Sequence, residues 1–377
     1  MIGRSSIRIS IVIPVYNQTS LLPVLLNSID EPDLDGQIEV IIVDDRSNED
    51  VEKAISRCKK PNPVSIISRE INGGYAAAVN TGISVANGDA VLLLNSDVFL
   101  TRSYIALLLN TIKEYRNTAV VTGVCLFPQS GNIQNAGIAF SKTNHYLLYY
   151  NSNPERAPID EITMLQAAAF ASVMIPMNIF DEIGVLDEEL VNGYDDIDFC
   201  FRARSRGFEI RLEPKAFCYH WERLSRDPRG VRRRDNIARV WSRWGAELKP
   251  DIIQYLALSA RRLQSQFPDV KSERYLVLLL GQDAGITLLR DSIVAGDLPF
   301  KIDRVQDARQ YSTVSDRFLL PLAVADDVTF SERPLLILVD RIDQIDDNII
   351  WIKNRKAITA IDIAIDLHGN VVLVGGI

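Results

Sequence analysis

A carboxylate, Asp97, interrupts the apolar run "LLLNSDVFL". Apolar runs of this length are typical of buried strands, and an ionised Asp at a strand end is costly unless it is solvated, hydrogen-bonded or bound to a cation. Asp45 follows the apolar run Ile38–Val43 in the same way, and Asn17 follows Ile7–Val15. These strand-end side chains are therefore candidates for binding a ligand.

A second group of acids lies in "GYDDIDF", where Asp195, Asp196 and Asp198 are followed by Arg202. A carboxylate can accept the proton of a hydroxyl group, as a general base does. The same acids also suit the N-terminus of a helix, and Asp198 with Arg202 has the i,i+4 spacing of a helical ion pair. His220 is one of only three histidines, and both a metal-ligating and a structural role are open to it.

Strands and helices alternate through the first hundred residues. The predicted strands are Ile7–Val15, Ile38–Val43, Val64–Ser68 and Ala90–Leu94, and the predicted helices between them are Leu21–Ile29, Val51–Cys58 and Tyr75–Ala86. This alternation predicts an α/β fold with a mainly parallel sheet and helices on both faces. Ligands of such sheets bind beyond the carboxyl ends of the strands, which is where the polar residues stand.

The rest of the chain predicts further elements and a second domain. We expect a strand-rich or irregular insertion at residues 120–165. Then follow a strand at Ala167–Ile175, helices at Asn178–Ile183, Asp196–Ser205 and Arg232–Leu248, and a strand pair in "EIRLEPKAFCYH". After residue 250 the alternation of strand, helix and strand begins again. We therefore expect two domains, residues 1–250 and residues 251–377, and the second is expected to be truncated because the chain ends on a strand and Gly-Gly.

The composition is that of a globular protein, with 377 residues, 47% of them hydrophobic, and a formal net charge of −8. This acidic balance argues against a nucleic-acid partner. No apolar run reaches the roughly 18 residues of a membrane span. The four cysteines have no CxxC spacing, and the segment before the first strand has no room for a secretory signal, so we expect reduced thiols in a cytoplasmic protein.

Eight arginines between Arg223 and Arg243 reverse the acidic balance locally. Guanidinium groups suit bidentate contact with phosphate. The stretch is expected to close over a diphosphate, to bind the phosphates of a lipid-linked molecule, or to touch anionic headgroups at the inner face of a membrane. A solvated helix face is the alternative.

Six segments, taken in order, resemble the family 2 glycosyltransferases with a GT-A fold, and the rhamnosyltransferase-like branch in particular. They are "IVIPVYN", "IIVDDRS", "NGGYAAAVNTGISVANGD", "LLLNSDV", "GYDDIDFCFRARSRG" and a His followed five residues later by Ser225. The resemblance covers residues 7 to about 245. It implies inverting transfer of a sugar from a nucleoside-diphosphate sugar, dTDP-rhamnose-like or UDP-linked, to a hydroxyl of a glycan or lipid-linked saccharide in cell-surface polysaccharide synthesis.

The resemblance also implies individual roles. Asp97 and His220 would ligate Mg²⁺ or Mn²⁺, which neutralises the leaving diphosphate. Asp196 would be the general base, with Asp195 where the family usually has Glu, and Asp198 beside them. The residues implied to bind or shape the donor site are Pro14, Tyr16, Asn17, Asp45, Asn72, Asn80, Asn95, Ser96 and Arg202. The family's DxD motif is Asn95-Ser96-Asp97 here, and its lower charge is expected to weaken metal binding.

Two other classes of function remain open from the sequence. A non-catalytic module on a decayed GT-A fold would hold a nucleotide sugar or glycan without turnover, although drift has no reason to keep Asp97, Asp196 and His220 together. A nucleotidyltransferase usually has a Gly-rich loop bearing Arg and Lys after its first strand, and "PVYNQTSLLP" lacks one. A sugar transferase releases a nucleoside diphosphate, whereas a nucleotidyltransferase releases pyrophosphate, so the product distinguishes the two enzymes.

Overall fold

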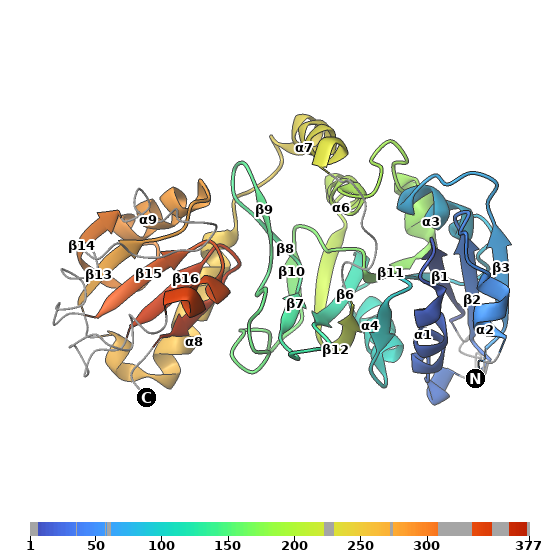
Figure 1. Cartoon of the computed structure of the whole chain (residues 1–377), viewed down its shortest axis with the longest axis horizontal. Helices are drawn as coiled ribbons and strands as arrows, with labels where there is room; N and C mark the ends of the chain where they lie inside the picture. Colours follow the sequence, from blue (N-terminus) through green and yellow to red (C-terminus); the bar gives the residue numbers. More distant parts are fainter. Residues whose placement is uncertain are drawn as a thin grey trace. The chain divides into compact units, whose positions relative to one another are not determined.

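The computed structural model describes residues 7–34, 36–56, 58, 62–221, 230–271, 274–307, 334–348 and 362–374 (Figure 1). The chain forms two compact units: unit 1 is Met1–Ile138 with Ile159–Leu248, and unit 2 is Ala139–Pro158 with Lys249–Ile377. The expected domains, residues 1–250 and 251–377, stay a prediction. Ala139–Pro158, which the expectation placed in the first domain, groups with unit 2.

Four parallel strands form one half of the sheet in unit 1, in the order β4-β1-β2-β3. Their bounds are β1 (Ile9–Val15), β2 (Ile38–Asp44), β3 (Val64–Ser68) and β4 (Ala90–Leu94). The strands are rich in Val, Ile and Leu because helices cover both of their faces. The predicted α/β fold with a mainly parallel sheet is confirmed, and all four predicted strands are present.

The other half of the sheet mixes parallel and antiparallel strands, in the order β10-β12-β6-β11-β4. Its members are β5 (Val98–Leu100), β6 (Thr118–Leu126), β7 (Ile133–Asn135), β10 (Thr163–Leu165), β11 (Ser172–Pro176) and β12 (Glu209–His220). β11 is antiparallel to β4, with Ser172 opposite Leu94, and β12 is antiparallel to β5, with His220 opposite Val98. The start of β11 and the end of β12 therefore both lie beside the carboxyl end of β4.

Three predictions for this half of the sheet need correction. The strand expected at Ala167–Ile175 begins only at Ser172. The strand pair expected at residues 209–220 is a single strand, β12, whose register against β6 shifts around Pro214, which has no N–H for a regular ladder. The insertion expected at residues 120–165 is strand-rich, as one of the two expected alternatives, but its first residues belong to β6, a strand in which every residue is buried.

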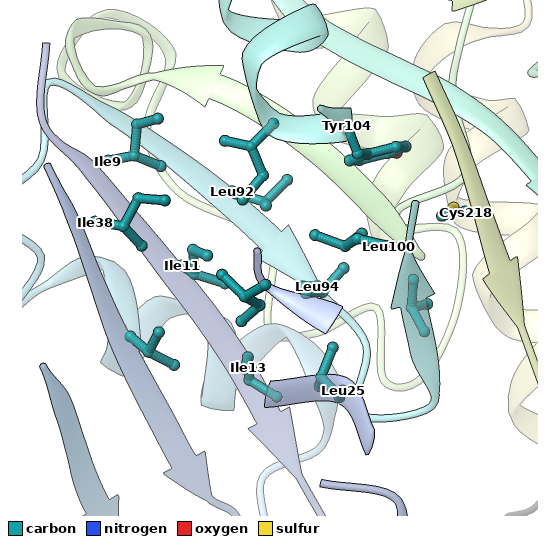
Figure 2. Packing of buried hydrophobic residues seen from close by; sticks show 14 of the residues in the cluster. Ile9, Ile11, Ile13, Leu25, Ile38, Leu92, Leu94, Leu100, Tyr104 and Cys218 are labelled. Carbon is teal, nitrogen blue, oxygen red and sulfur yellow. The ribbon is translucent and has the colours of Figure 1, made fainter. Parts of the chain in front are cut away.

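Helices cover both faces of this sheet (Figure 1). They are α1 (Leu22–Ser28), α2 (Val51–Ile55), α3 (Tyr75–Ile83), α4 (Tyr104–Glu114), α5 (Met177–Ile183), α6 (Asp195–Ser205) and α7 (Gly230–Trp244), with 3-10 turns η1 (Thr19–Leu21) and η2 (Pro32–Leu34). On one face, Ile9, Ile11 and Ile13 share a core cluster with Leu25 of α1 and Tyr104 of α4 (Figure 2). Only α4 has no counterpart among the predicted helices of unit 1.

α3 packs on the opposite face, where a glycine permits close approach to the sheet. A Cβ added at Gly82 would lie 2.3 Å from a methyl carbon of Val12 on β1 and 3.2 Å from a methyl carbon of Val43 on β2. Neither valine has room to move because both are buried within parallel strands. The absence of a side chain at Gly82 thus sets the distance of α3 from the sheet.

Unit 2 has a five-stranded sheet in the order β14-β13-β15-β16-β17, and β8 pairs with β9. Its elements are β8 (Ile138–Phe140), β9 (His145–Leu147), α8 (Ile252–Gln266), η3 (Pro268–Lys271), β13 (Arg274–Leu279), α9 (Gly285–Ala295), β14 (Lys301–Asp307), β15 (Leu335–Val339), η5 (Ile342–Asn348), β16 (Ile363–Asp366) and β17 (Val371–Leu373). The predicted order of strand, helix and strand is present as β13, α9 and β14. α8 and β16 were not predicted.

All four cysteines carry free thiols, as the absence of CxxC spacing led us to expect. Cys125 of β6 and Cys218 of β12 are register partners on neighbouring strands, and their sulfur atoms lie 3.4 Å apart. Both side chains are fully buried.

We predict that Gly82→Ala lowers the free energy of unfolding. Overpacking of a dense core typically costs about 1–3 kcal/mol, which exceeds the gain of up to about 1 kcal/mol in helix propensity. Urea denaturation measures the difference. Ser84→Ala, at an exposed position at the end of α3, is the control and should change stability by less than about 0.5 kcal/mol. A Gly82→Ala protein as stable as the wild type would contradict the close packing.

Candidate active site

Hydrogen bonds join the turns that follow β1 and β2. The backbone N–H of Asn17 donates to Ser47 Oγ at 2.8 Å, and the N–H of Asn48 donates to Asn17 Oδ1 at 2.8 Å. Asn17 has a φ of 57°, in the left-handed region that Asn tolerates well. Pro14 lies in β1, and Tyr16 beside it is 49% exposed. Asn17 therefore shapes the turn, and the ring of Tyr16 is the surface available to a ligand.

Asp45, buried after β2, binds the loop that follows β3. Its Oδ1 accepts from Arg69 Nη1 at 2.5 Å and from Gly73 N at 3.0 Å, while Oδ2 accepts from Gly74 N at 2.8 Å. An ionised carboxylate offers about four acceptor positions, so three of them hold the Gly-Gly turn in place. Sequence reasoning missed Arg69, whose only signal is its place after the neighbouring parallel strand. Asn72, in the same turn, is exposed.

α3 connects this turn to the acidic segment, by which we mean residues 187–198. The N–H of Tyr75 donates to Asn192 Oδ1 at 3.2 Å, and its hydroxyl donates to Phe170 O at 2.7 Å. Asn80 exchanges two hydrogen bonds with the backbone of Leu186, through Nδ2 at 2.9 Å and Oδ1 at 3.0 Å. Since both ends of its amide hold the backbone, Asn80 suits a positioning role better than contact with a donor.

The two residues expected to ligate a metal lie together. Asp97 Oδ1 is 3.2 Å from His220 Nε2, because the pairing of β5 with β12 places the two positions side by side. The N–H of Trp221 donates to Asp97 O at 3.0 Å. Ser96 is partly buried, and Asn95 has a buried Oδ1 that meets no hydrogen-bond donor among the described residues.

A divalent cation fits this pair. Mg²⁺ is typically held by one or two carboxylates together with substrate phosphates and water, and neutral imidazole also suits Mn²⁺. The described part of the chain contains no group of three or more His, Cys, Asp or Glu residues that could hold a metal ion. Asp97 and His220 would therefore share the ion with phosphate oxygens. The orphaned acceptor of Asn95 is a further oxygen at the same strand end.

Asp195 and Asp196 begin α6 in different surroundings. Burial, and then the negative charge of Asp196, raise the pKa of Asp195 well above its ordinary value. Asp196 accepts the N–H of Ile197 at 2.8 Å and the N–H of Phe170. Burial raises the pKa of Asp196 to about 6, although these two N–H groups oppose the shift. A carboxyl with a pKa of about 6 is largely ionised at neutral pH, so Asp196 can accept a proton there, whereas burial and the charge of Asp196 disfavour the ionised form of Asp195.

The residues just before β11 join the two halves of the site. Phe170 donates its N–H to Asp196 and accepts the hydroxyl of Tyr75 at its carbonyl oxygen. The carbonyl of the next residue, Ala171, accepts the N–H of Asn95 at 2.9 Å. Two consecutive residues thus connect the carboxylate of Asp196 to the turn that carries Asp97.

Asp198 is buried and fully engaged by donors. Its Oδ2 accepts from Arg202 Nε at 2.8 Å, and its Oδ1 accepts from Trp244 Nε1 at 2.9 Å and from Arg243 Nη1 at 3.1 Å. Arg202 also donates to two backbone carbonyls before α6, at 2.7 and 2.9 Å. The arrangement supports α6 from behind, which agrees with the expectation that Asp198 and Arg202 buttress the site, and their catalytic and donor-binding roles stay predictions.

α7 holds the backbone that leads into α6. Asn236 Nδ2 donates to Val191 O at 3.1 Å and to Gly193 O at 2.9 Å. Asn192, Gly193 and Tyr194 have φ values of 54°, 151° and 70°. Asn and Gly adopt positive φ readily, but for the bulky Tyr194 this conformation is strained and persists only when its surroundings fix it. Asn236, which the sequence did not single out, supplies part of that support.

Three of the eight arginines have described side chains: Arg234, Arg239 and Arg243. Arg239 pairs with Glu189, and Arg243 lies 2.5 Å from Asp187. Arg234 is exposed. The side chains from Arg223 to Arg233, and Ser225, lie outside the described residues. Two of the three described arginines thus anchor the acidic segment, and phosphate contact by the stretch stays a prediction.

Comparison with known proteins agrees with this geometry. Residues 10–170 match the family model described as glycosyl transferase family 2. The match lies almost entirely in unit 1 and includes the turns after β1, β2 and β4. It ends at Phe170, before the acidic segment begins.

Curated relatives are similar over about half of the chain. An uncharacterized glycosyltransferase, YwdF, of Bacillus subtilis is 27% identical over 55% of this chain and 72% of its own length. The pre-mycofactocin glycosyltransferase of Mycobacterium tuberculosis is 27% identical over 58% of this chain and 43% of its own length. The low-salt glycan biosynthesis hexosyltransferase Agl10 of Haloferax volcanii is 25% identical over 47% of this chain and 57% of its own length. The chain thus spans about half the length of the last two relatives.

Solved structures support the GT-A fold. GalNAc-T7, solved with UDP, GalNAc and Mn²⁺, aligns with a TM-score of 0.52 at 17% identity over 64% of this chain and 48% of its own. The mannosyltransferase PcManGT of Pyrobaculum calidifontis, solved with GDP-Man and Mn²⁺, aligns with a TM-score of 0.51 at 15% identity. The alignment covers 78% of this chain and 81% of that structure. At these identities the likeness shows the fold alone.

We predict that Asp196→Asn raises the melting temperature at about pH 8. The pKa of Asp196 is raised from 3.8 to about 6 on folding, so ionisation destabilises the folded state as the pH rises from about 4 to 6 and beyond. The amide removes this destabilisation, and the gain should vanish as the pH falls to about 3, below the pKa of the carboxyl in both states. Thermal denaturation across this range measures it. Asp181→Asn, at an exposed position of α5, is the control and should show no such trend. A gain that does not depend on pH would contradict the burial argument.

Proposed function

We propose that unit 1 transfers a sugar from a nucleoside-diphosphate sugar to a hydroxyl group of a glycan or lipid-linked saccharide, with inversion at the anomeric carbon. The observation that carries the proposal is the connection through Phe170 and Ala171. It joins a carboxylate whose pKa is raised to about 6 to the turn of the Asp97–His220 pair. A base and a site for charge neutralisation side by side are what displacement of a diphosphate requires.

The proposed reaction is a single displacement. The acceptor oxygen forms a bond to the anomeric carbon while its proton passes to the carboxylate of Asp196. The bond between the anomeric carbon and the diphosphate oxygen breaks, and its electron pair leaves with the diphosphate. A divalent cation bound by Asp97 and His220 would supply neutralisation of that leaving charge. Asp195 is proposed to support the site rather than to act as the base, because burial and the charge of Asp196 raise its pKa well above the ordinary value.

Donor recognition is proposed for the turns after β1, β2 and β3. Asp45 retains about one acceptor position after its three intramolecular bonds, enough for the N–H of a uracil or thymine ring. Tyr16 is exposed beside it and offers an aromatic face to the nucleoside. These features are compatible with a dTDP-rhamnose-like or UDP-linked donor.

The proposed acceptor and setting are those of polysaccharide assembly. One similar protein is named as a hexosyltransferase of glycan biosynthesis, which supports a saccharide acceptor. No helix within the described ranges is long and apolar enough to cross a membrane. We propose that the chain works in the cytoplasm and reaches a lipid-linked acceptor through peripheral contact of the arginine stretch, where Arg234 is exposed.

We predict that Asp97→Ala abolishes the contribution of Mn²⁺ to nucleoside-diphosphate binding. Loss of this carboxylate removes one of the two protein ligands, so metal-dependent affinity should fall by about 10-fold or more. Calorimetry with UDP and dTDP, with and without Mn²⁺, measures the effect. The control, Asp89→Ala, removes a carboxylate just before the opposite end of β4 and should bind like the wild type. Unchanged metal dependence in Asp97→Ala would exclude this residue as a ligand.

We also predict that Asp196→Asn reduces kcat by roughly 10²-fold or more, a typical share for general base catalysis. Donor affinity should stay within a few-fold of the wild type, because the base acts in the transition state. Asp195→Asn is the matched control and should cost less, since burial and the charge of Asp196 disfavour the ionised form of Asp195 that a base requires. Release of nucleoside diphosphate from a panel of donors and acceptors gives the rates. A larger loss in Asp195→Asn would move the base to that residue, and near-normal turnover in both variants would refute the mechanism.

A further inference from the structure

Gln134 of β7 lies in none of the family segments, yet both ends of its amide contact His220. Its Nε2 donates to the backbone carbonyl oxygen of His220 at 3.1 Å, and its Oε1 lies 2.6 Å from His220 Nδ1. Gln134 is 2% exposed, so these contacts are shielded from water. A buried amide held at both ends has one orientation.

The backbone carbonyl decides which end of the amide faces the imidazole. A carbonyl oxygen only accepts hydrogen bonds, so the NH₂ group of Gln134 must face the carbonyl of His220. The amide oxygen then faces Nδ1, and because an amide oxygen also only accepts, Nδ1 must carry a hydrogen. The neutral imidazole of His220 is thereby fixed with its hydrogen on Nδ1 and its lone pair on Nε2.

Nε2 is the ring nitrogen that faces Asp97, with 3.2 Å between Nε2 and Oδ1. With the hydrogen on Nδ1 and the ring neutral, both of these atoms are electron-pair donors, and two such atoms this close favour a shared cation. That cation is a proton when the ring is imidazolium, and a divalent metal ion competes with the proton for the same position. The other neutral form, with its hydrogen on Nε2, would donate to Asp97 and close the position to a metal. The orientation of the Gln134 amide therefore decides whether Asp97 and His220 can bind a metal ion together or only form a hydrogen bond with each other.

We propose that Gln134 is a positioning residue that makes His220 a metal ligand by fixing its hydrogen on Nδ1. The inference rests on the proposed function only in that it assigns the cation to the Asp97–His220 pair. Hydrogen-bond partners of metal-ligating histidines commonly fix the ring in this way, and their loss typically lowers metal affinity by about 10- to 100-fold.

The first test determines which nitrogen of His220 carries the hydrogen, without metal or substrate. Long-range ¹H–¹⁵N correlation of protein labelled at its histidines, at a pH where imidazole is neutral, distinguishes the two forms. The signals of His220 are assigned by their loss in His220→Asn. We expect the hydrogen on Nδ1 in the wild type and a shift toward Nε2 in Gln134→Leu. A wild-type protein with the hydrogen on Nε2 would overturn the proposal.

The second test measures Mn²⁺ affinity by electron paramagnetic resonance in the presence of UDP. We expect Gln134→Leu to bind Mn²⁺ about 10- to 100-fold more weakly. Gln134→Glu keeps an acceptor facing Nδ1 although it loses the donor to the His220 carbonyl, so it should bind Mn²⁺ more tightly than Gln134→Leu does, a ranking that a general loss of packing would not produce. Gln264→Leu in unit 2 removes another buried glutamine that donates to a backbone carbonyl, and serves as the control. Equal affinity in Gln134→Leu and the wild type would refute the proposal.

Neither measurement needs sugar transfer, so the two hypotheses fail separately. Loss of Mn²⁺ affinity in Gln134→Leu, in a protein that releases no nucleoside diphosphate, would keep the role of Gln134 and reject the transferase. Turnover that depends on Asp196 together with unchanged Mn²⁺ affinity in Gln134→Leu would do the reverse.

Discussion

The antiparallel pairing of β11 with β4 is the contact on which the site depends. Because β11 runs against its neighbour, its first residues, and not its last, lie at the edge where β1, β2 and β4 end. Phe170 and Ala171 precede the strand, so their backbone groups are available for Asp196, Tyr75 and Asn95. A parallel strand in this position would bring its carboxyl end here and leave α6 without this anchor.

Unit 1 accommodates three acids at the start of α6 because each carboxyl group has different surroundings. Asp198 is surrounded by charged and indole donors, burial disfavours the ionised form of Asp195 by raising its pKa, and Asp196 is supported by two backbone N–H groups. Burying three ionised carboxylates together would be very costly without such division. The result is one carboxylate, that of Asp196, whose two backbone donors leave it able to accept a proton at neutral pH, held in place by the helices around it.

The parallel strands and the position of the site followed from the sequence, because β-branched runs that end in Asn or Asp are local signals. β6 was missed, since its small residues, Thr122 and Gly123 among them, interrupt the apolar pattern of a strand that is nevertheless fully buried. The pairing of Asp97 with His220 was anticipated only through a family resemblance. Gln134 and Asn236 were not found, because a single amide reveals its role only when distant segments meet.

Unit 2 is built from two separate segments of the chain, so a single cut in the sequence cannot separate it from unit 1. The chain enters unit 2 at Ala139, leaves it after Pro158 and returns at Lys249. Within that unit, the N–H of Phe140 donates to Asp251 Oδ1 at 2.7 Å and the N–H of Tyr149 donates to His368 O at 2.7 Å. A protease cut after Leu248, or a gene split there, would leave residues 139–158 on one fragment and these acceptors on the other. The two halves of such a split gene would regain unit 2 only by reassociating, so this junction is a natural place for fragment complementation and an unsuitable one for independent expression.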